Sequence, residues 1–245
     1  MEESNLLKSV FIPFGELVAR NMADELEVKN GLLQPKEVYI KQKTQDVVSA
    51  IEQELLTRDA NLNKAAVLLR EHLSSLSILQ KEKIEKEMIE AEKKVVDLLS
   101  KKQEVSKEDT FQSLLGFSNE TLIWIYSVGY QFFQEKKGDD AFVIFQMLTT
   151  LNPLVADYWI AQGLTQKMLQ KDIEALHSFS MASVMKPNNP IPRFHSVDLY
   201  LKLGQLDNAK LEFGALEKIM EIGNYSDLRS FVDVLRNKIQ FAKTG

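Results

Sequence analysis

Histidine is the residue type of this chain best suited to metal binding or acid–base catalysis, and it occurs only as His72, His177 and His195. None of the three has a partner at the spacing of a metal site, and there is no cysteine to act as ligand or nucleophile. The adjacent acids Asp139 and Asp140 fall in an expected turn, where solvated carboxylates are ordinary. Phosphate-binding GxGxxG and GxxxxGK loops and a Gly-x-Ser-x-Gly elbow are absent. The sequence therefore predicts no catalytic residue, no metal site and no cofactor, and so a protein that is not an enzyme.

Small and aromatic residues recur every 34 positions in the second half of the chain. The recurring sets are Ala141, Ala175 and Ala209; Phe145, Phe179 and Phe213; Gly129 and Gly163; and Pro153 and Pro187. A fixed period in this range is typical of repeat arrays, and the order small, aromatic, proline fits the second helix of a tetratricopeptide (TPR) unit. Three TPR units are predicted at about residues 122–155, 156–189 and 190–223. A capping helix with a polar outer face is expected at about 226–243.

Each unit is expected to be a hairpin of two helices. In the first unit, Ile125, Val128 and Phe132 recur at helical spacing and form one apolar stripe. Gly129 has no side chain where the two helices would cross, so their backbones can approach closely. Pro153 ends the second helix, because the residue before a proline is pushed out of the α region. With few strand-like alternations elsewhere, the fold class is all-α, a TPR helix-hairpin solenoid preceded by an α-helical extension.

Residues 1–110 differ from the TPR domain at 111–245, because they hold 38 of the 65 charged residues. A helix is expected to about Thr57, followed by a break at Asp59–Asn61 and a second helix. Further on, a short heptad seam gives the extension a partly coiled-coil-like character. The seam consists of Ile84, Met88, Ala91, Val95 and Leu98, and it pairs either within the chain or between two chains.

Two further segments complete the extension. Residues 1–34 contain an amphipathic stretch around Phe11 and Phe14, expected to pack on the body of the protein or to form a homodimer contact. Residues 101–110 are polar and charged, as in a linker. Ser118 or Asn119 is then expected to cap the first repeat helix.

Charge and hydropathy limit the partners of the chain. Its 245 residues carry a formal net charge of −5, which argues against a nucleic-acid partner, because such partners require a basic surface. No apolar run approaches the ~18–20 residues that span a bilayer. Residues Met1 to Ser4 lack the basic segment and apolar run of a secretory signal. A cytoplasmic location without membrane insertion is expected.

The first helix of each TPR unit lines the concave face of the stack, which is the face used for binding. The positions expected to point there are Ile123, Tyr126, Tyr130 and Phe133 in the first unit, Asp157, Ile160, Leu164 and Lys167 (with the adjacent Met168) in the second, and Ile191, Phe194, Asp198 and Leu201 in the third. This mostly apolar and aromatic lining suits an extended peptide with a few hydrophobic anchors. The alternative is that the N-terminal helices or a second subunit cover the groove permanently.

The same lining argues against one familiar TPR function. A clamp for a C-terminal carboxylate requires converging lysine, arginine and asparagine side chains, whereas Tyr126 and Tyr130 occupy two of the places concerned. A co-chaperone of Hsp70 or Hsp90 is therefore not expected.

Four segments of the repeat region carry a family resemblance. They are Ile125-Tyr-Ser-Val-Gly-Tyr-Gln-Phe-Phe, Asp140-Ala-Phe-Val-Ile-Phe-Gln, His177-Ser-Phe-Ser-Met-Ala-Ser-Val-Met, and Pro192-Arg-Phe-His followed by Leu203-Gly-Gln-Leu. With them, the run Leu122–Met220 resembles the class II chaperones of bacterial type III secretion, the LcrH/SycD family. Members of that family have a short N-terminal helical region, whereas this chain has about 110 additional residues there.

The resemblance implies a cytoplasmic, non-catalytic bacterial chaperone that holds a hydrophobic translocator or effector by an extended segment in the concave groove. It further implies that Tyr126, Tyr130, Phe133 and the Phe194–His195 region contact this client. The alternative function is a structural or regulatory scaffold of a multiprotein secretion machine, docking through its N-terminal helices.

Overall fold

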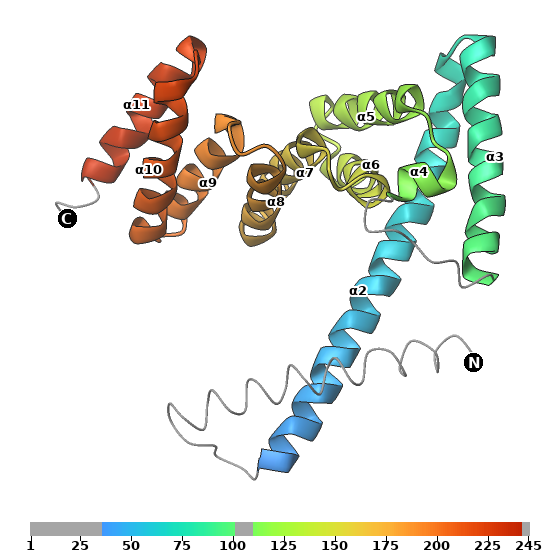
Figure 1. The fold of residues 1–245 in the computed structure, drawn as a ribbon, viewed down its shortest axis with the longest axis horizontal. Helices are drawn as coiled ribbons and strands as arrows, with labels where there is room; N and C mark the ends of the chain where they lie inside the picture. Colours follow the sequence, from blue (N-terminus) through green and yellow to red (C-terminus); the bar gives the residue numbers. More distant parts are fainter. Residues whose placement is uncertain (1–35, 101–109, 242–245) are drawn as a thin grey trace. The chain divides into compact units, whose positions relative to one another are not determined.

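The computed structural model describes residues 36–100 and 110–241, and in these ranges it contains helices and no strand (Figure 1). The elements are α2 (Lys36–His72), the 3-10 helix η1 (Leu73–Ser75), α3 (Ile78–Ser100), α4 (Phe111–Leu115), α5 (Asn119–Gln134), α6 (Gly138–Leu151), α7 (Ala156–Met168), α8 (Asp172–Met185), α9 (Pro190–Lys202), α10 (Leu206–Ile222) and α11 (Ser226–Phe241). The predicted all-α fold class is confirmed. The predicted amphipathic stretch in residues 1–34 and most of the predicted linker lie outside the described residues.

The chain divides into two compact units, Met1–Asn63 and Lys64–Gly245. The described part of the first unit belongs to α2, which continues without interruption through the break predicted at Asp59–Asn61. That prediction is wrong because the helix propensities of Asp and Asn cost only tenths of a kcal/mol per residue. Within the helix, the Asn63 amide also donates a hydrogen bond to the Asp59 carboxylate, with 3.4 Å between Nδ2 and Oδ2.

Three helix hairpins follow one another in the second unit and match the predicted repeats. They are α5 with α6, α7 with α8, and α9 with α10, and the alanines of the 34-residue period are completely buried in them. A Cβ atom on Gly163 would lie 2.7 Å from the ring of Phe179, and one on Gly129 would lie 2.9 Å from the ring of Phe145. The glycines thus allow the aromatic ring of the second helix to pack directly on the backbone of the first.

The turn inside each hairpin repeats as well. Lys136, Gln170 and Gly204 end the first helices with φ angles of 59°, 60° and 71°. In each turn the next amide donates to a carbonyl five residues earlier, for example from Lys171 N to Gln166 O at 2.9 Å. This is the Schellman arrangement, which requires a left-handed residue. The third unit has glycine in this turn, and Val197 occupies the place of Gly129 and Gly163 in its first helix.

The N-terminal edge of the repeat core is built by residues from α2 and α3. Ala65 and Leu69 are completely buried, and they share one hydrophobic cluster with Leu122 and Ile125 of α5. This shared core explains why the structural division falls after Asn63, well before the boundary expected near residue 110 from charge density. Local charge density does not reveal that one face of a helix joins a distant core.

The heptad seam contributes to the same cluster. Ile84 and Ala91 are buried and Met88 is partly buried against the core. The first part of the seam therefore packs within the chain, which removes it as a free surface for pairing between chains. The side chains of Val95 and Leu98 lie outside the described residues.

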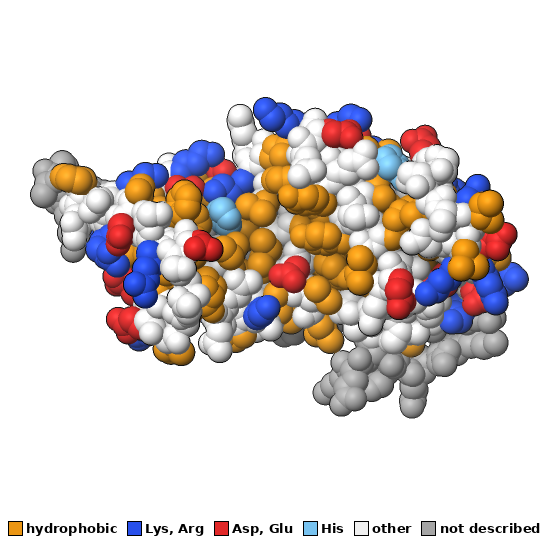
Figure 2. All heavy atoms as spheres, turned by 90° about the horizontal axis from the view of Figure 1, so that it is seen from above, with side chains coloured by type: hydrophobic (Ala, Val, Ile, Leu, Met, Phe, Trp, Pro, Cys, Tyr) orange, Lys and Arg blue, Asp and Glu red, His pale blue; other side chains and the backbone are white. Residues whose placement is uncertain are grey.

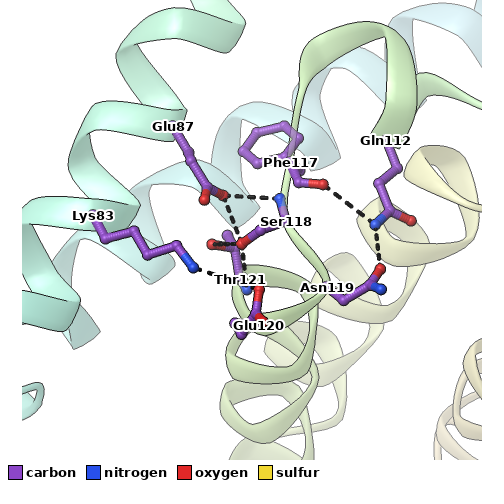
Figure 3. A network of polar contacts seen from close by, with 8 residues as sticks. All are labelled: Lys83, Glu87, Gln112, Phe117, Ser118, Asn119, Glu120 and Thr121. Carbon is purple, nitrogen blue, oxygen red and sulfur yellow. Dashed lines mark hydrogen bonds and ion pairs between the residues drawn. The ribbon is translucent and has the colours of Figure 1, made fainter.

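A carboxylate joins α3 to the start of α5 (Figure 3). Ser118, the N-cap residue of α5, donates to Glu87 Oε2 from its backbone nitrogen at 3.0 Å and from its hydroxyl at 3.2 Å. Burial opposes ionisation of Glu87, but hydrogen bonds from Thr121 and Ser118 outweigh it and lower the pKa of the carboxyl below its ordinary value. Lys83 adds an exposed ion pair with Glu120 at 3.4 Å. The predicted cap at Ser118 is thus confirmed.

Helix α11 closes the other end of the array. Val232, Leu235 and Ile239 are buried in a cluster that also contains Leu216 of α10. Its outer face is less polar than predicted, because Phe231 remains 58% exposed.

Candidate peptide-binding groove

Helix α5 presents two different faces. Leu122, Ile125 and Val128 are buried inside the first hairpin, as the helical stripe in the sequence predicted. On another side of the helix, Ile123 is 67% exposed and Tyr130 48% exposed. The period of an α-helix separates these sets, because residues one or two positions apart point in different directions. The exposed side of α5, with Ile123 and Tyr130, is therefore available to a ligand.

Two adjoining recesses connect this face of α5 to α7. One is lined by Tyr126, Tyr130, Phe133, Phe145, Ile160, Ala161 and Leu164. The other is lined by Ile123, Tyr126, Val155, Asp157, Tyr158 and Ile160. Because the two share Tyr126 and Ile160, they form one surface, called here the α5–α7 groove. Figure 2 shows one face of the molecule on which hydrophobic side chains gather in the middle, with few charged side chains among them.

Tyr126 is held in the groove by neighbouring rings. Its ring centroid lies 5.5 Å from that of Phe145 and 6.0 Å from that of Tyr158. Burial raises the pKa of the Tyr126 hydroxyl, and the nearby charge of Asp157 adds to this effect. The hydroxyl therefore stays protonated and can donate a hydrogen bond at the edge of an otherwise apolar surface.

The structure brings together seven of the residues predicted to line the concave face. They are Ile123, Tyr126, Tyr130, Phe133, Asp157, Ile160 and Leu164. Four further lining residues, Phe145, Val155, Tyr158 and Ala161, were not predicted. The 34-residue period assigns Phe145 to the hairpin interior, and only the packed structure shows that its ring also reaches the groove floor.

The remaining predicted residues are placed elsewhere. Met168 lies beside the turn at Gly138, where a Cβ atom would be 3.5 Å from its sulfur. Phe194 and Leu201 pack against the cluster formed with α11. Sequence spacing alone could not show that the capping helix covers this part of the third unit.

Lys167, His195 and Asp198 form a polar cluster at the third unit. The Lys167 ammonium lies 3.0 Å from Asp198 Oδ2 and 3.4 Å from His195 Nδ1. The His195 ring stacks on Phe179 with 5.1 Å between centroids. Burial and the positive charge of Lys167 lower the pKa of His195 to about 4, although Asp198 opposes the shift. The imidazole is therefore neutral at neutral pH.

Neither a metal centre nor a membrane span is found in the part of the chain that the structure describes. Within residues 36–100 and 110–241, no group of three or more histidine, aspartate or glutamate side chains could hold a metal ion. No helix in these ranges combines the length and the apolar character needed to cross a bilayer.

Known proteins resemble part of this chain. No family model matches the chain. Low calcium response locus protein H of Yersinia pestis is 27% identical over 135 residues, which covers 55% of this chain and 80% of that protein. The chain resembles the LcrH/SycD family. The resemblance read from the four sequence segments is thereby confirmed.

Two solved structures have a similar fold. A T3SS complex from Aeromonas hydrophila contains a chain that is 25% identical, with a TM-score of 0.52, and the match covers 56% of this chain and 89% of that one. The CopN-Scc3 complex contains a chain that is 21% identical, with a TM-score of 0.50, covering 58% and 85%. At that identity the second likeness concerns the fold alone. Each match leaves more than a third of the present chain outside the shared region.

Proposed function

We propose that this protein is a non-catalytic chaperone that binds an extended hydrophobic segment of a type III secretion translocator or effector in the α5–α7 groove. The groove carries the proposal, because Ile123 and Tyr130 leave large apolar surface exposed beside the recessed ring of Tyr126. Apolar patches of this kind on soluble proteins usually mark binding sites. The 27% identity to Low calcium response locus protein H supports a role in type III secretion.

The chemistry of the groove favours an extended ligand with separated anchors. Its walls come from two helices, α5 and α7, and its two recesses share Tyr126 and Ile160. One apolar side chain of the client fills each recess, while the hydroxyls of Tyr126 and Tyr130 can hydrogen-bond to the client backbone. A bacterial cytoplasmic location follows from this role, since the client is held before export. The homodimer expected through residues 1–34 stays a prediction.

Co-expression with the type III secretion translocators of the same bacterium tests the proposal. The wild-type chain should yield a soluble 1:1 or higher-order complex on size exclusion, and the combined substitutions Tyr126→Ala and Phe133→Ala should weaken it at least tenfold. Burial of one such anchor contributes ~1.5–3 kcal/mol. Because Tyr126 also packs on Phe145, the exposed variant Ile123→Asp provides a second test that leaves the hairpin core intact.

A matched control removes an aromatic ring outside the groove. Phe111 is 53% exposed on α4, and Phe111→Ala should leave the complex unchanged. If the complex survives Ile123→Asp and the double substitution with undiminished affinity, the α5–α7 groove is not the client site.

A further inference from the structure

The polar cluster around Asp198 lies next to the apolar groove. Leu164 lines the groove, and Lys167 follows it by three positions on α7. Residues at that spacing are neighbours on one helix surface, with about 5–6 Å between their Cβ atoms. A ligand that contacts Leu164 therefore passes close to the Lys167 ammonium.

The cluster carries more positive than negative charge. Asp198 forms two ion pairs. Its Oδ2 lies 3.0 Å from the ammonium of Lys167, and its Oδ1 lies 3.5 Å from the ammonium of Lys238 on α11. His195 contributes no charge at neutral pH, for the reasons given above. Two lysines around one carboxylate leave these four side chains with a net charge of +1.

The cluster also has hydrogen-bond donors to spare. An ammonium group can only donate, so the contact with Lys167 makes His195 Nδ1 an acceptor and places the ring proton on Nε2. Each lysine has three N–H bonds and uses part of them on Asp198 and His195. The side chains of Lys167 and Lys238 are 24% and 55% exposed, so one is partly desolvated and the other is open to solvent.

We propose that Lys167, Lys238 and His195 bind the side-chain carboxylate of an aspartate or glutamate in the client segment, within about three residues of the anchor that contacts Leu164. The spacing follows from the 5–6 Å between neighbouring helix positions and the ~3.3 Å that an extended chain advances per residue. A second carboxylate beside Asp198 would balance the cluster and use its free donors. This inference rests on the proposed function and adds a charge requirement to the apolar anchors.

The competing interpretation is purely structural. The same contacts join α7, α9 and α11, and they could serve only to hold the third unit and the capping helix together. The two interpretations differ in whether the bound segment must contain an acid.

A random twelve-residue peptide library displayed on phage distinguishes the ligand-binding interpretation of the cluster from the purely structural one. The peptides are fused at their C-terminal ends, so none offers a free C-terminal carboxylate and any selected acid is a side chain. The baits are the wild-type chain, Lys238→Gln and the control Lys86→Gln, which changes an exposed lysine on α3. Lys238→Gln lowers the net charge of the cluster to zero and leaves the Lys167–Asp198 pair intact.

The wild-type chain and Lys86→Gln should select apolar anchors with an aspartate or glutamate within three positions. Lys238→Gln should select the same anchors with the acid preference reduced. For a selected peptide, replacing its glutamate by glutamine should raise the dissociation constant of the wild-type complex about tenfold, as for a charge-assisted hydrogen bond. With Lys238→Gln or Lys167→Met as the protein, the same replacement should change it less than threefold.

The outcomes also distinguish this inference from the proposed function. Selection of apolar anchors without enrichment of acids would overturn the inference and leave the chaperone role standing. Selection of no apolar anchors would overturn the proposed function, and the inference with it.

Discussion

His195 joins an aromatic stack to a charged pair, and its position makes the stability of the fold depend on pH. The ring packs on Phe179, and burial and Lys167 lower its pKa to about 4 from an ordinary value near 6.5. The unfolded chain therefore takes up a proton as the pH falls through 6.5, whereas the folded chain does not do so until about pH 4. The free energy of unfolding should fall by about 1–2 kcal/mol between pH 7 and 5.

Denaturant unfolding at pH 7 and pH 5 measures this effect. His195→Gln should show a smaller loss than the wild type, because glutamine does not titrate. His177→Gln, at an exposed position, is the control and should behave like the wild type. The lowered pKa values of Glu87 and Asp198 reduce stability mainly below about pH 5, as those carboxyls become protonated in the unfolded chain. If His195→Gln lost as much stability between pH 7 and pH 5 as the wild type, His195 would not be the source of the pH dependence.

Two glycines of the third repeat should respond to alanine in opposite directions. Gly204 has a φ of 71° in the Schellman turn, and alanine there should lower the free energy of unfolding by about 1 kcal/mol. Gly214 lies inside α10 with open space where a Cβ would stand, so alanine should raise it by about 0.5–1 kcal/mol. Gln170 has a φ of 60° in the corresponding turn of the second repeat, so Gln170→Gly should raise the free energy of unfolding. Urea midpoints of the three variants provide the measurement.

At the scale of the elements, the joint between α3 and α5 depends on one carboxylate. Glu87 accepts two hydrogen bonds from Ser118, so Glu87→Gln should cost about 1 kcal/mol and speed amide exchange in α3. Lys83→Met, which removes an exposed ion pair of the same joint, should have little effect. Hydrogen exchange of the peptides from 78–94 distinguishes the two. Client affinity should stay within twofold of the wild-type value, because neither α2 nor α3 lines the α5–α7 groove.

At the scale of the whole molecule, we expect the stability of the repeat array to depend on residues of α2 and α3, which share its core. A fragment comprising residues 64–245 should keep the cooperative unfolding and client binding of the full chain. A fragment comprising residues 111–245 would uncover Leu122 and Ile125, which share a core with Ala65 and Leu69. Exposing several such side chains, at ~1.5–3 kcal/mol each, removes much of a typical domain stability of ~5–15 kcal/mol.

Circular dichroism during thermal unfolding, together with size exclusion, compares the two fragments. The shorter one should unfold at lower temperature or aggregate. Equal melting temperatures would show that the repeats are stable without α2 and α3.

The 34-residue period allowed the fold to be predicted closely, because each repeat places the same residue types at the same contacts. Ala141, Ala175 and Ala209 are all completely buried, and α11 begins at Ser226, as expected for the capping helix. The predicted helix break at Asp59–Asn61 was wrong because no repeated pattern supported it. It rested on the local propensity of two residue types, which is weak beside the cooperativity of a long helix.

The sequence by itself determined the number of repeats and the residues inside each hairpin, since these follow from helical periodicity along a continuous segment. It also identified seven residues of the α5–α7 groove, because helical spacing separates the faces of α5 and of α7. Only the tertiary structure decided that residues from α2 and α3 complete the first repeat, that α11 takes Phe194 and Leu201 into its own cluster, and that Lys238 meets Lys167 at Asp198. Those contacts join segments far apart in the chain, and no spacing in the sequence encodes which exposed face a distant helix will cover.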